Sequence, residues 1–122
     1  MRIGEVAELL GVETHVLRHW EDEGVVVPSR LANGYRDYDE EALTRLRVVL
    51  ACREVGLSLA DTRLVLDRSA EGRADVIRAH RRRVDRQVAE LTRTGAFLDH
   101  VLGCRHDLMS RCRGCAAYAG AI

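Results

Sequence analysis

Hydrophobic positions in the first 24 residues follow the spacing of two short amphipathic helices. The first set recurs at intervals of three and four residues, as one face of a helix does: Ile3, Val6, Ala7 and Leu10. Gly11 then marks the end of this helix, and Thr14 can cap the next one, which stops at Gly24. The inner face of the second helix consists of Val16, Leu17 and Trp20. Two short helices across a tight turn predict a helix-turn-helix motif.

The following segment carries the signals of a β-hairpin. Residues 25–27 are three valines, which predicts a short strand that ends at Pro28. Asn33 and Gly34 form a strong tight-turn signal, because both residue types tolerate a positive φ. Residues 35–38 alternate as a returning strand would. The pattern therefore predicts a small wing directly after the helix-turn-helix motif.

Two more helices are predicted after the wing. Asp39 can cap the first of them, whose inner face consists of Leu43, Leu46 and Leu50. Ser58 and Asp61 match the capping box that opens the next helix, which we expect to reach about Arg68.

A single long helix is predicted from Arg73 to about Leu102. Its apolar or small positions are spaced alternately by three and four residues and so share one face: Val76, His80, Val84, Val88, Leu91, Gly95, Leu98 and Leu102. Thirty residues span about 45 Å at 1.5 Å per residue. A domain this small cannot cover such a helix, so the apolar face predicts a homodimer joined by a coiled coil.

These elements predict a mainly α chain in three parts. A winged helix-turn-helix DNA-binding domain occupies residues 1–70, a dimerisation helix residues 71–102, and a short Cys-rich tail residues 103–122. The tail has no clean hydrophobic period, and it contains three of the four cysteines of the chain. We interpret it as an effector-binding segment.

Composition and charge change this picture in two ways. The 19 basic residues balance 19 acidic ones, so the net charge of zero gives no support to nucleic-acid binding, which must be argued from motifs. The chain lacks both an 18-residue apolar run and a signal-peptide pattern, so we expect a cytoplasmic protein without membrane contact. Cysteines in that compartment stay reduced, which favours metal binding or redox sensing over a disulfide framework.

Four local sequences, in this order of elements, resemble the mercury-resistance-regulator (MerR) family: Ile3-Gly4-Glu5-Val6-Ala7, Leu17-Arg18-His19-Trp20-Glu21, Gly24-Val25-Val26 and Asn33-Gly34-Tyr35-Arg36-Asp37-Tyr38. Trp20 is a departure, since the family usually has tyrosine there. The resemblance implies a transcription activator rather than an enzyme. It also implies a homodimer with an antiparallel coiled coil, which distorts palindromic promoter DNA so that RNA polymerase can use it.

The second helix is expected to read the DNA. Its N-terminal end would present Thr14, His15 and Arg18 to the major groove. The resemblance places Arg18 at the phosphate-contacting arginine of the family. Trp20 serves either as a DNA contact or as a core anchor, and the sequence leaves both interpretations open.

The wing is expected to hold the DNA backbone. Arg36 follows the turn and would contact phosphate, with Tyr35 and Tyr38 in support. Arg30 is a further candidate at the start of the wing.

The tail carries a complete set of soft metal ligands. Thiolate and imidazole are the donors that zinc and copper prefer, and the candidates are Cys104, His106, Cys112 and Cys115. His100, one helical turn before Cys104, is a fifth candidate. The set predicts a metal-ion cofactor, either zinc or a copper(I)-like ion.

The resemblance implies more about the metal. Cys104 and Cys112 match the cysteine pair after the dimerisation helix of metal-sensing members, with the spacing of the monovalent type. Divalent sensors add a cysteine from the start of the other subunit's long helix, and the corresponding residues 73–75 here contain none. Two options stay open: a two-coordinate site for a monovalent soft metal, or a fuller, zinc-like site that His106 and Cys115 join.

Other functions fit the same cysteines. Cys112 and Cys115 form a C-x-x-C that could act as a redox-sensing thiol switch. An iron–sulfur regulator of the same fold is a further alternative, although the tail has three cysteines where a cluster usually needs four. A zinc-containing interaction factor that never binds DNA is the third. A thiol–disulfide enzyme is excluded because no predicted strand precedes the C-x-x-C.

Overall fold

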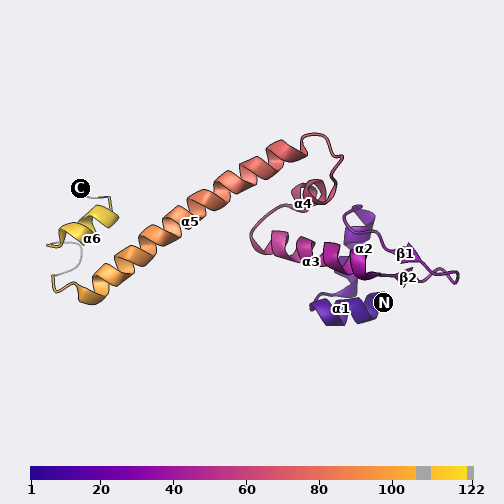
Figure 1. Cartoon of the computed structure of the whole chain (residues 1–122). Coiled ribbons are helices and arrows are strands. Elements are labelled where there is room, and N and C mark those ends of the chain that lie inside the picture. Colours follow the sequence, from indigo (N-terminus) through magenta and orange to yellow (C-terminus); the bar gives the residue numbers. More distant parts are fainter. Residues whose placement is uncertain (107–110, 121–122) are drawn as a thin grey trace. The chain divides into compact units, whose positions relative to one another are not determined.

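The computed structural model describes residues 1–106 and 111–120. The chain divides into two compact units, Met1–Ile77 and Arg78–Ile122 (Figure 1). Among the described residues, no helix combines the length and the apolar character that a membrane crossing requires.

The helix-turn-helix motif consists of α1 (Ile3–Leu10) and α2 (Thr14–Asp22). Gly11 ends α1 in the left-handed conformation, with φ 68°, and its N–H donates to the Ala7 carbonyl. The prediction that Thr14 caps α2 is wrong by one residue. Glu13 is the N-cap, because its backbone is extended while its carbonyl already accepts from the N–H of Leu17.

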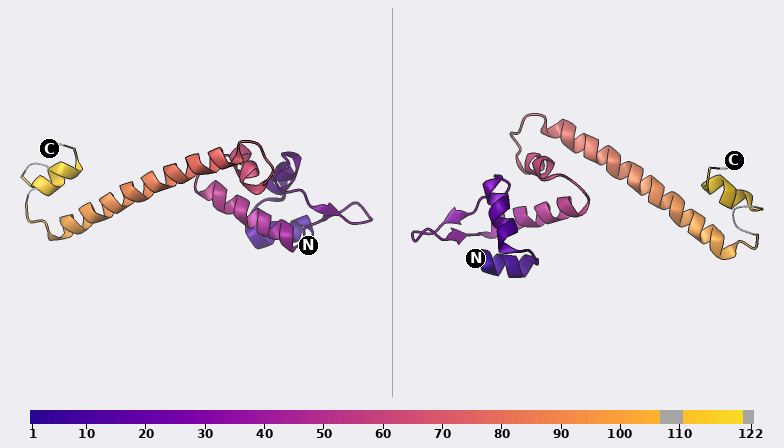
Figure 2. Two further views of the ribbon diagram at one scale, coloured as in Figure 1. Left: turned by 45° about the horizontal axis from the view of Figure 1, so that its top comes forward. Right: turned by 180° about the vertical axis from the view of Figure 1, so that it is seen from behind.

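The predicted wing is present as a two-stranded antiparallel hairpin. β1 (Ser29–Arg30) pairs with β2 (Arg36–Asp37), with Ser29 opposite Asp37 and Arg30 opposite Arg36. At the turn, Gly34 has φ 87° and the Asn33 side chain accepts from the N–H of Tyr35. In both further views the hairpin extends away from the neighbouring helices (Figure 2).

The strand expected at residues 25–27 is wrong. The N–H of Val25 donates to the carbonyl of Trp20 at 2.8 Å, which closes the end of α2. Val25 and Val26 are each 2% exposed in the core. Their apolar character therefore reflects burial rather than strand pairing, and pairing begins after Pro28.

Two capped helices complete the first unit. Asp39 caps α3 (Glu40–Glu54) by accepting from the N–H of Ala42, and Ser58 caps α4 (Leu59–Leu66) by accepting from that of Asp61. The helix α4 thus ends two residues before the expected Arg68. The core that joins these elements contains Val6, Ala7, Leu17, Trp20, Val25, Val26, Tyr38, Ala42, Leu43, Leu46 and Val49.

The second unit contains most of α5 (Arg73–Gly103) and the short α6 (Arg113–Tyr118). None of the side chains of α5 is buried in the described chain. Tyr118 fastens α6 against the last turns of α5. Its ring stacks on Phe97 with centroids 4.1 Å apart, and its hydroxyl lies 2.8 Å from that of Thr94. The end of α5 and α6 therefore form one packed structure.

Candidate metal centre and nucleic-acid interface

The first unit has a concave surface between the start of α1, the exposed side of α2 and the wing. Its cavity volume is about 720 Å³, and four arginines line it: Arg2, Arg18, Arg30 and Arg36. Tyr35 also lines it, and the guanidinium of Arg2 lies 4.6 Å from the centroid of this ring. We call these four arginines the arginine surface. Such a group of positive charges suits a phosphate backbone.

Glu21 of α2 holds two of these arginines. Its carboxylate lies 2.7 Å from Nε of Arg36 and 3.1 Å from Nη2 of Arg30. The Glu21 side chain is only 11% exposed, so these ion pairs are less screened by water than ordinary surface pairs. Glu21 therefore ties the wing to the helix that precedes it.

The residues expected to contact DNA fall into two groups. Thr14, His15 and Arg18 lie along one side of α2, where Nη1 of Arg18 is 3.5 Å from the Thr14 hydroxyl. His15 and Arg18 are exposed, as are Arg30 and Tyr35, while Arg36 is half-buried.

Trp20 and Tyr38 lie in the core, 7% and 1% exposed. The Tyr38 hydroxyl has no hydrogen-bond partner among the described residues. Burial, with the nearby Glu21 carboxylate, raises the pKa of this phenol above its ordinary value. In the free chain these two rings therefore belong to the core of the first unit.

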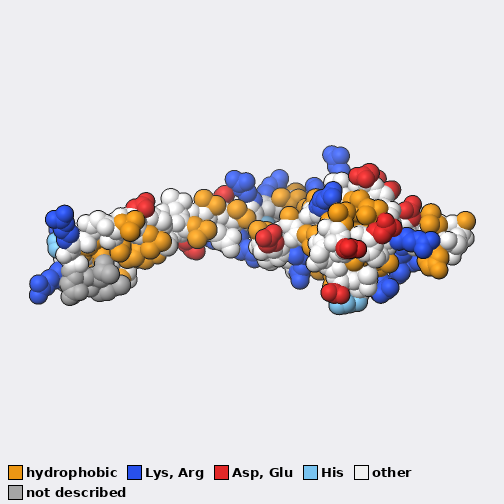
Figure 3. All heavy atoms as spheres, turned by 90° about the horizontal axis from the view of Figure 1, so that it is seen from below, with side chains coloured by type: hydrophobic (Ala, Val, Ile, Leu, Met, Phe, Trp, Pro, Cys, Tyr) orange, Lys and Arg blue, Asp and Glu red, His pale blue; other side chains and the backbone are white. Residues whose placement is uncertain are grey.

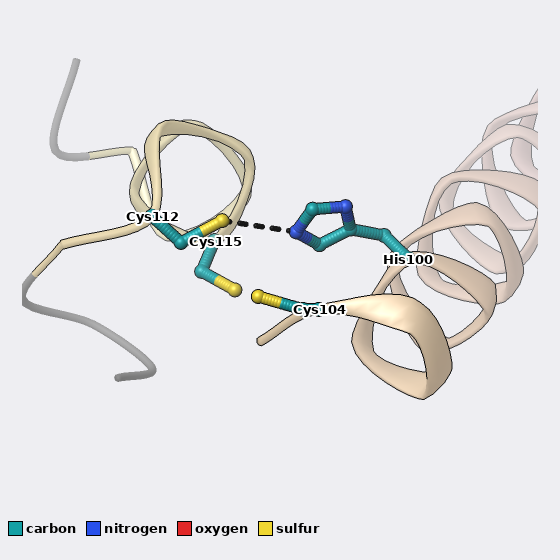
Figure 4. A group of neighbouring side chains, drawn as sticks. All are labelled: His100, Cys104, Cys112 and Cys115. Atoms are coloured by element: carbon teal, nitrogen blue, oxygen red, sulfur yellow. Dashed lines mark hydrogen bonds between the residues drawn. The ribbon is translucent and has the colours of Figure 1, made fainter. Parts of the chain in front are cut away.

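A cluster of metal-ligating side chains stands where α6 meets the end of α5. One donor atom from each of four residues lies within 4.8 Å of all the others: His100, Cys104, Cys112 and Cys115 (Figure 4). We call this set the His/Cys cluster. His100 is on α5, Cys104 follows its last residue, Cys112 is the N-cap of α6 and Cys115 is within α6. Nε2 of His100 lies 3.1 Å from Sγ of Cys112.

Burial and charge differ among the cysteines. Cys112 and Cys115 are 6% and 0% exposed, whereas Cys104 is half-buried. The pKa of the Cys112 thiol falls to about 6, mainly because the backbone N–H of Cys115 stabilises the thiolate, with help from the His100 side chain. Burial and the neighbouring Cys112 raise the pKa of Cys115 to about 11.

The predicted ligand His106 contacts one member of the His/Cys cluster but is not among the four donors that all lie within 4.8 Å of one another. Its Nδ1 is 4.0 Å from Sγ of Cys104, and its side chain is exposed. The structure instead brings His100 to the three cysteines. The sequence signal for His100 is its position four residues, about one helical turn, before Cys104, which keeps the two residues close at the end of α5.

The donor set fits a metal ion. Four ligands around tetrahedral zinc, with Zn–S bonds near 2.3 Å, place neighbouring sulfurs about 3.8 Å apart. Donors that already lie within 4.8 Å of one another need only a small contraction to reach that arrangement. Three thiols and an imidazole are also the ligand types that thiophilic ions prefer.

Comparison with known proteins gives the family. Residues 1–69 match the family described as "MerR HTH family regulatory protein", and residues 43–101 match "MerR, DNA binding". The chain belongs to the MerR family. Among MerR-type relatives, it is 32% identical over 112 residues to "HTH-type transcriptional regulator HmrR" of Rhizobium leguminosarum bv. viciae. The matched region covers 87% of this chain and 87% of HmrR.

Two solved MerR structures are relevant to the two sites. HiNmlR, described as a MerR family regulator lacking the sensor domain and bound to promoter DNA, is 25% identical with a TM-score of 0.67. That match covers 84% of this chain and 86% of HiNmlR. PbrR691 from Ralstonia metallidurans CH34, in complex with lead(II), is 26% identical with a TM-score of 0.57, covering 96% and 98%. The fold predicted from sequence, a MerR-type DNA-binding head followed by a long helix, is confirmed.

Proposed function

We propose that this MerR-family chain regulates transcription as a homodimer that binds promoter DNA and responds to a thiophilic metal ion. The observation that carries the metal response is the His/Cys cluster, which stands directly after the long helix. A bound ion would supply strong bonds that join ligands from two helices. The chain's own residues would then hold α6 firmly to the end of α5. We expect this regulator to be located in the cytoplasm.

The arginine surface supports the DNA-binding part of the proposal. Exposed Arg18 on α2 and the wing arginines could contact phosphates on either side of a groove. HiNmlR, whose fold this chain shares, is described as bound to promoter DNA. By the same family reasoning, the dimer would distort the promoter so that RNA polymerase can use it.

The exposed face of α5 supports the homodimer. Side chains along this face are open to solvent in the single chain: Val84, Val88, Leu91, Leu98 and Leu102, with exposures from 37% to 88%. Hydrophobic side chains are visible along the long helix in Figure 3. A row of exposed apolar side chains is buried when it packs on another apolar surface, and the same row in a second copy of the chain would provide that surface.

The metal response is tested by transcription from the promoter of the chain's own operon, with and without metal. We expect metal-dependent transcription that is lost in Cys104→Ser and Cys112→Ser, whose promoter binding persists. Cys52→Ser is the matched control, since Cys52 lies on α3 of the first unit and is not one of the four donors of the His/Cys cluster, so this variant should respond normally. Induction that survives in both cluster variants would contradict the metal response. Failure to bind palindromic promoter DNA at low salt, with and without metal, would contradict the whole proposal.

A thiol switch is the second candidate, because the sulfurs of Cys104, Cys112 and Cys115 already lie within 4.8 Å of one another. Hydrogen peroxide would oxidise two of these thiols: its O–O bond and the two S–H bonds break, the peroxide takes two electrons and two protons, and one S–S bond and two water molecules form. In the same assay, a response to peroxide without metal would favour this candidate, and a response to metal under reducing conditions would exclude it.

A further inference from the structure

Gly114 of α6 faces the ring of His100 at very short range. A Cβ atom built at this position would lie 2.9 Å from both Cε1 and Nε2 of the imidazole. Real Cβ atoms essentially never come this close to another heavy atom, so any other residue would force the ring or α6 to move. The lack of a side chain at Gly114 therefore leaves room for the imidazole in the position where Nε2 lies 3.1 Å from Sγ of Cys112.

The position of α6 is fixed independently of the cluster. Tyr118 stacks on Phe97, shares a hydrogen bond with Thr94, and lies under the guanidinium of Arg93 at 4.7 Å. Thr94, Phe97 and His100 recur every three residues, and Arg93 lies four residues before Phe97, so all four lie on one side of α5. The aromatic contact holds one end of α6, and the His/Cys cluster lies at the other.

We propose that the His/Cys cluster is a four-ligand site for one divalent, tetrahedral ion, with His100 as its fourth ligand and Gly114 as a positioning residue. This inference rests on the proposed function and names the class of ion. Two thiolates are enough for a two-coordinate monovalent ion. Four donors within 4.8 Å, three sulfurs and one imidazole nitrogen, instead match the Cys₃His set of tetrahedral zinc.

The site is complete within one chain. Cys112 caps α6 and Cys115 lies within it, while His100 lies in the last turn of α5 and Cys104 directly follows that helix. A divalent ion therefore needs no cysteine from the start of a partner's long helix, a position that lacks cysteine in this chain. His106 is not needed either, because four donors already fill a tetrahedron.

The ligand assignment is tested with Co²⁺, which reports tetrahedral thiolate coordination by its visible absorption. Titration of the full, reduced chain should give one Co²⁺ per chain with intense tetrahedral bands. His100→Ala should weaken binding by more than about 100-fold, beyond the usual effect of a group outside the ligand set, and should alter the bands. His106→Ala is the matched control and should behave as the unchanged chain. The reverse pattern, with His106 essential and His100 dispensable, would overturn the assignment.

The role of Gly114 is tested by Gly114→Ala against Gly103→Ala. A Cβ at Gly103 meets no described atom within 4 Å, and its φ is not positive, so this control should bind Co²⁺ normally. Gly114→Ala should weaken binding by about 10- to 100-fold, as loss of ligand orientation does. In the double variant with His100→Ala, the change at Gly114 should add no further loss, because the colliding ring is gone. An equal additional loss there would show that Gly114 acts on the fold and would overturn its positioning role.

Failure of this inference is distinguishable from failure of the proposed function. If His100→Ala and Cys115→Ser both keep full Co²⁺ affinity, the four-ligand site is wrong while a two-cysteine metal response can stand. If Co²⁺ binds as described but no metal changes transcription, the site is right and the regulatory proposal is wrong.

Discussion

At the scale of single residues, Glu21 has an unusual role in a DNA-binding head. It places a negative charge beside two arginines that we expect to meet phosphate. Its two ion pairs hold the wing against α2 before DNA binds, which would lower the conformational entropy that the wing loses on binding. Sequence reasoning missed this residue because the pairing joins positions 9 and 15 residues apart, across a turn of unknown geometry.

Glu21→Gln should destabilise the first unit. The change removes the charge that pairs with half-buried Arg36, and losing one partner of such a hydrogen bond costs about 1–2 kcal/mol. Denaturant unfolding measures this change in the free energy of unfolding. Asp22→Asn, an exposed change of the same type at the next position, should have little effect, and an equal loss in both variants would contradict the role of Glu21.

Arg18→Ala should weaken promoter binding about tenfold without altering the dimer. The loss corresponds to one charge-assisted contact, and the slope of log affinity against log salt should fall by about one. Binding titrations at several salt concentrations measure both quantities. Arg86→Ala removes an exposed arginine from α5 and should leave them unchanged. An unaltered salt slope in Arg18→Ala would remove this residue from the DNA interface.

At the scale of elements, local chemistry made most of the fold predictable. Asp39 and Ser58 cap their helices as expected, and Asn33-Gly34 turns the wing, because each signal depends on neighbouring backbone alone. The strand predicted at residues 25–27 is absent, because buried positions such as Val25 and Val26 favour the same branched side chains as paired strands do. The spacing of Cys104, Cys112 and Cys115 is enough to predict them as candidate metal ligands, and the structure brings their sulfurs together. The choice between His100 and His106 could not be made, because it depends on how the chain folds back to bring α6 onto α5.

Tyr118→Ala should loosen α6 from α5 in the metal-free chain. An aromatic stack contributes about 0.5–1.5 kcal/mol beyond its buried area, so opening should increase roughly 2- to 10-fold. Cys115, fully buried in α6, reports this opening through its rate of reaction with a thiol reagent. Tyr35→Ala on the exposed wing should not change that rate, and an unchanged rate in Tyr118→Ala would mean that the stack does not hold α6.

At the scale of the whole molecule, α5 has two different faces. The exposed apolar row includes Leu91 and Leu98, whereas the residues that contact α6 include Arg93 and Phe97. At 3.6 residues per turn, the centres of these two sets lie about a third of a turn apart around the helix. A second copy of the chain can therefore pack on one face of α5 while α6 and the His/Cys cluster occupy the other.

Leu91→Glu should weaken the proposed homodimer. A carboxylate among the apolar side chains of the dimer contact costs about 1–3 kcal/mol, which raises the dissociation constant of the dimer about 5- to 150-fold. Sedimentation at a series of protein concentrations measures it. Ala89→Glu adds the same charge on the opposite face of α5 and serves as the control. Equal dissociation constants for the two variants would contradict a dimer contact that includes Leu91.

The contact between Gly114 and His100 also constrains how this regulator can evolve. Every other amino acid carries a Cβ, so any substitution at position 114 displaces the imidazole or α6. Lineages that keep the histidine should keep the glycine, and the glycine should become free to vary only after the histidine is lost. The two positions are 14 residues apart in the chain, yet they should change in a fixed order, as a pair of mutations joined by epistasis.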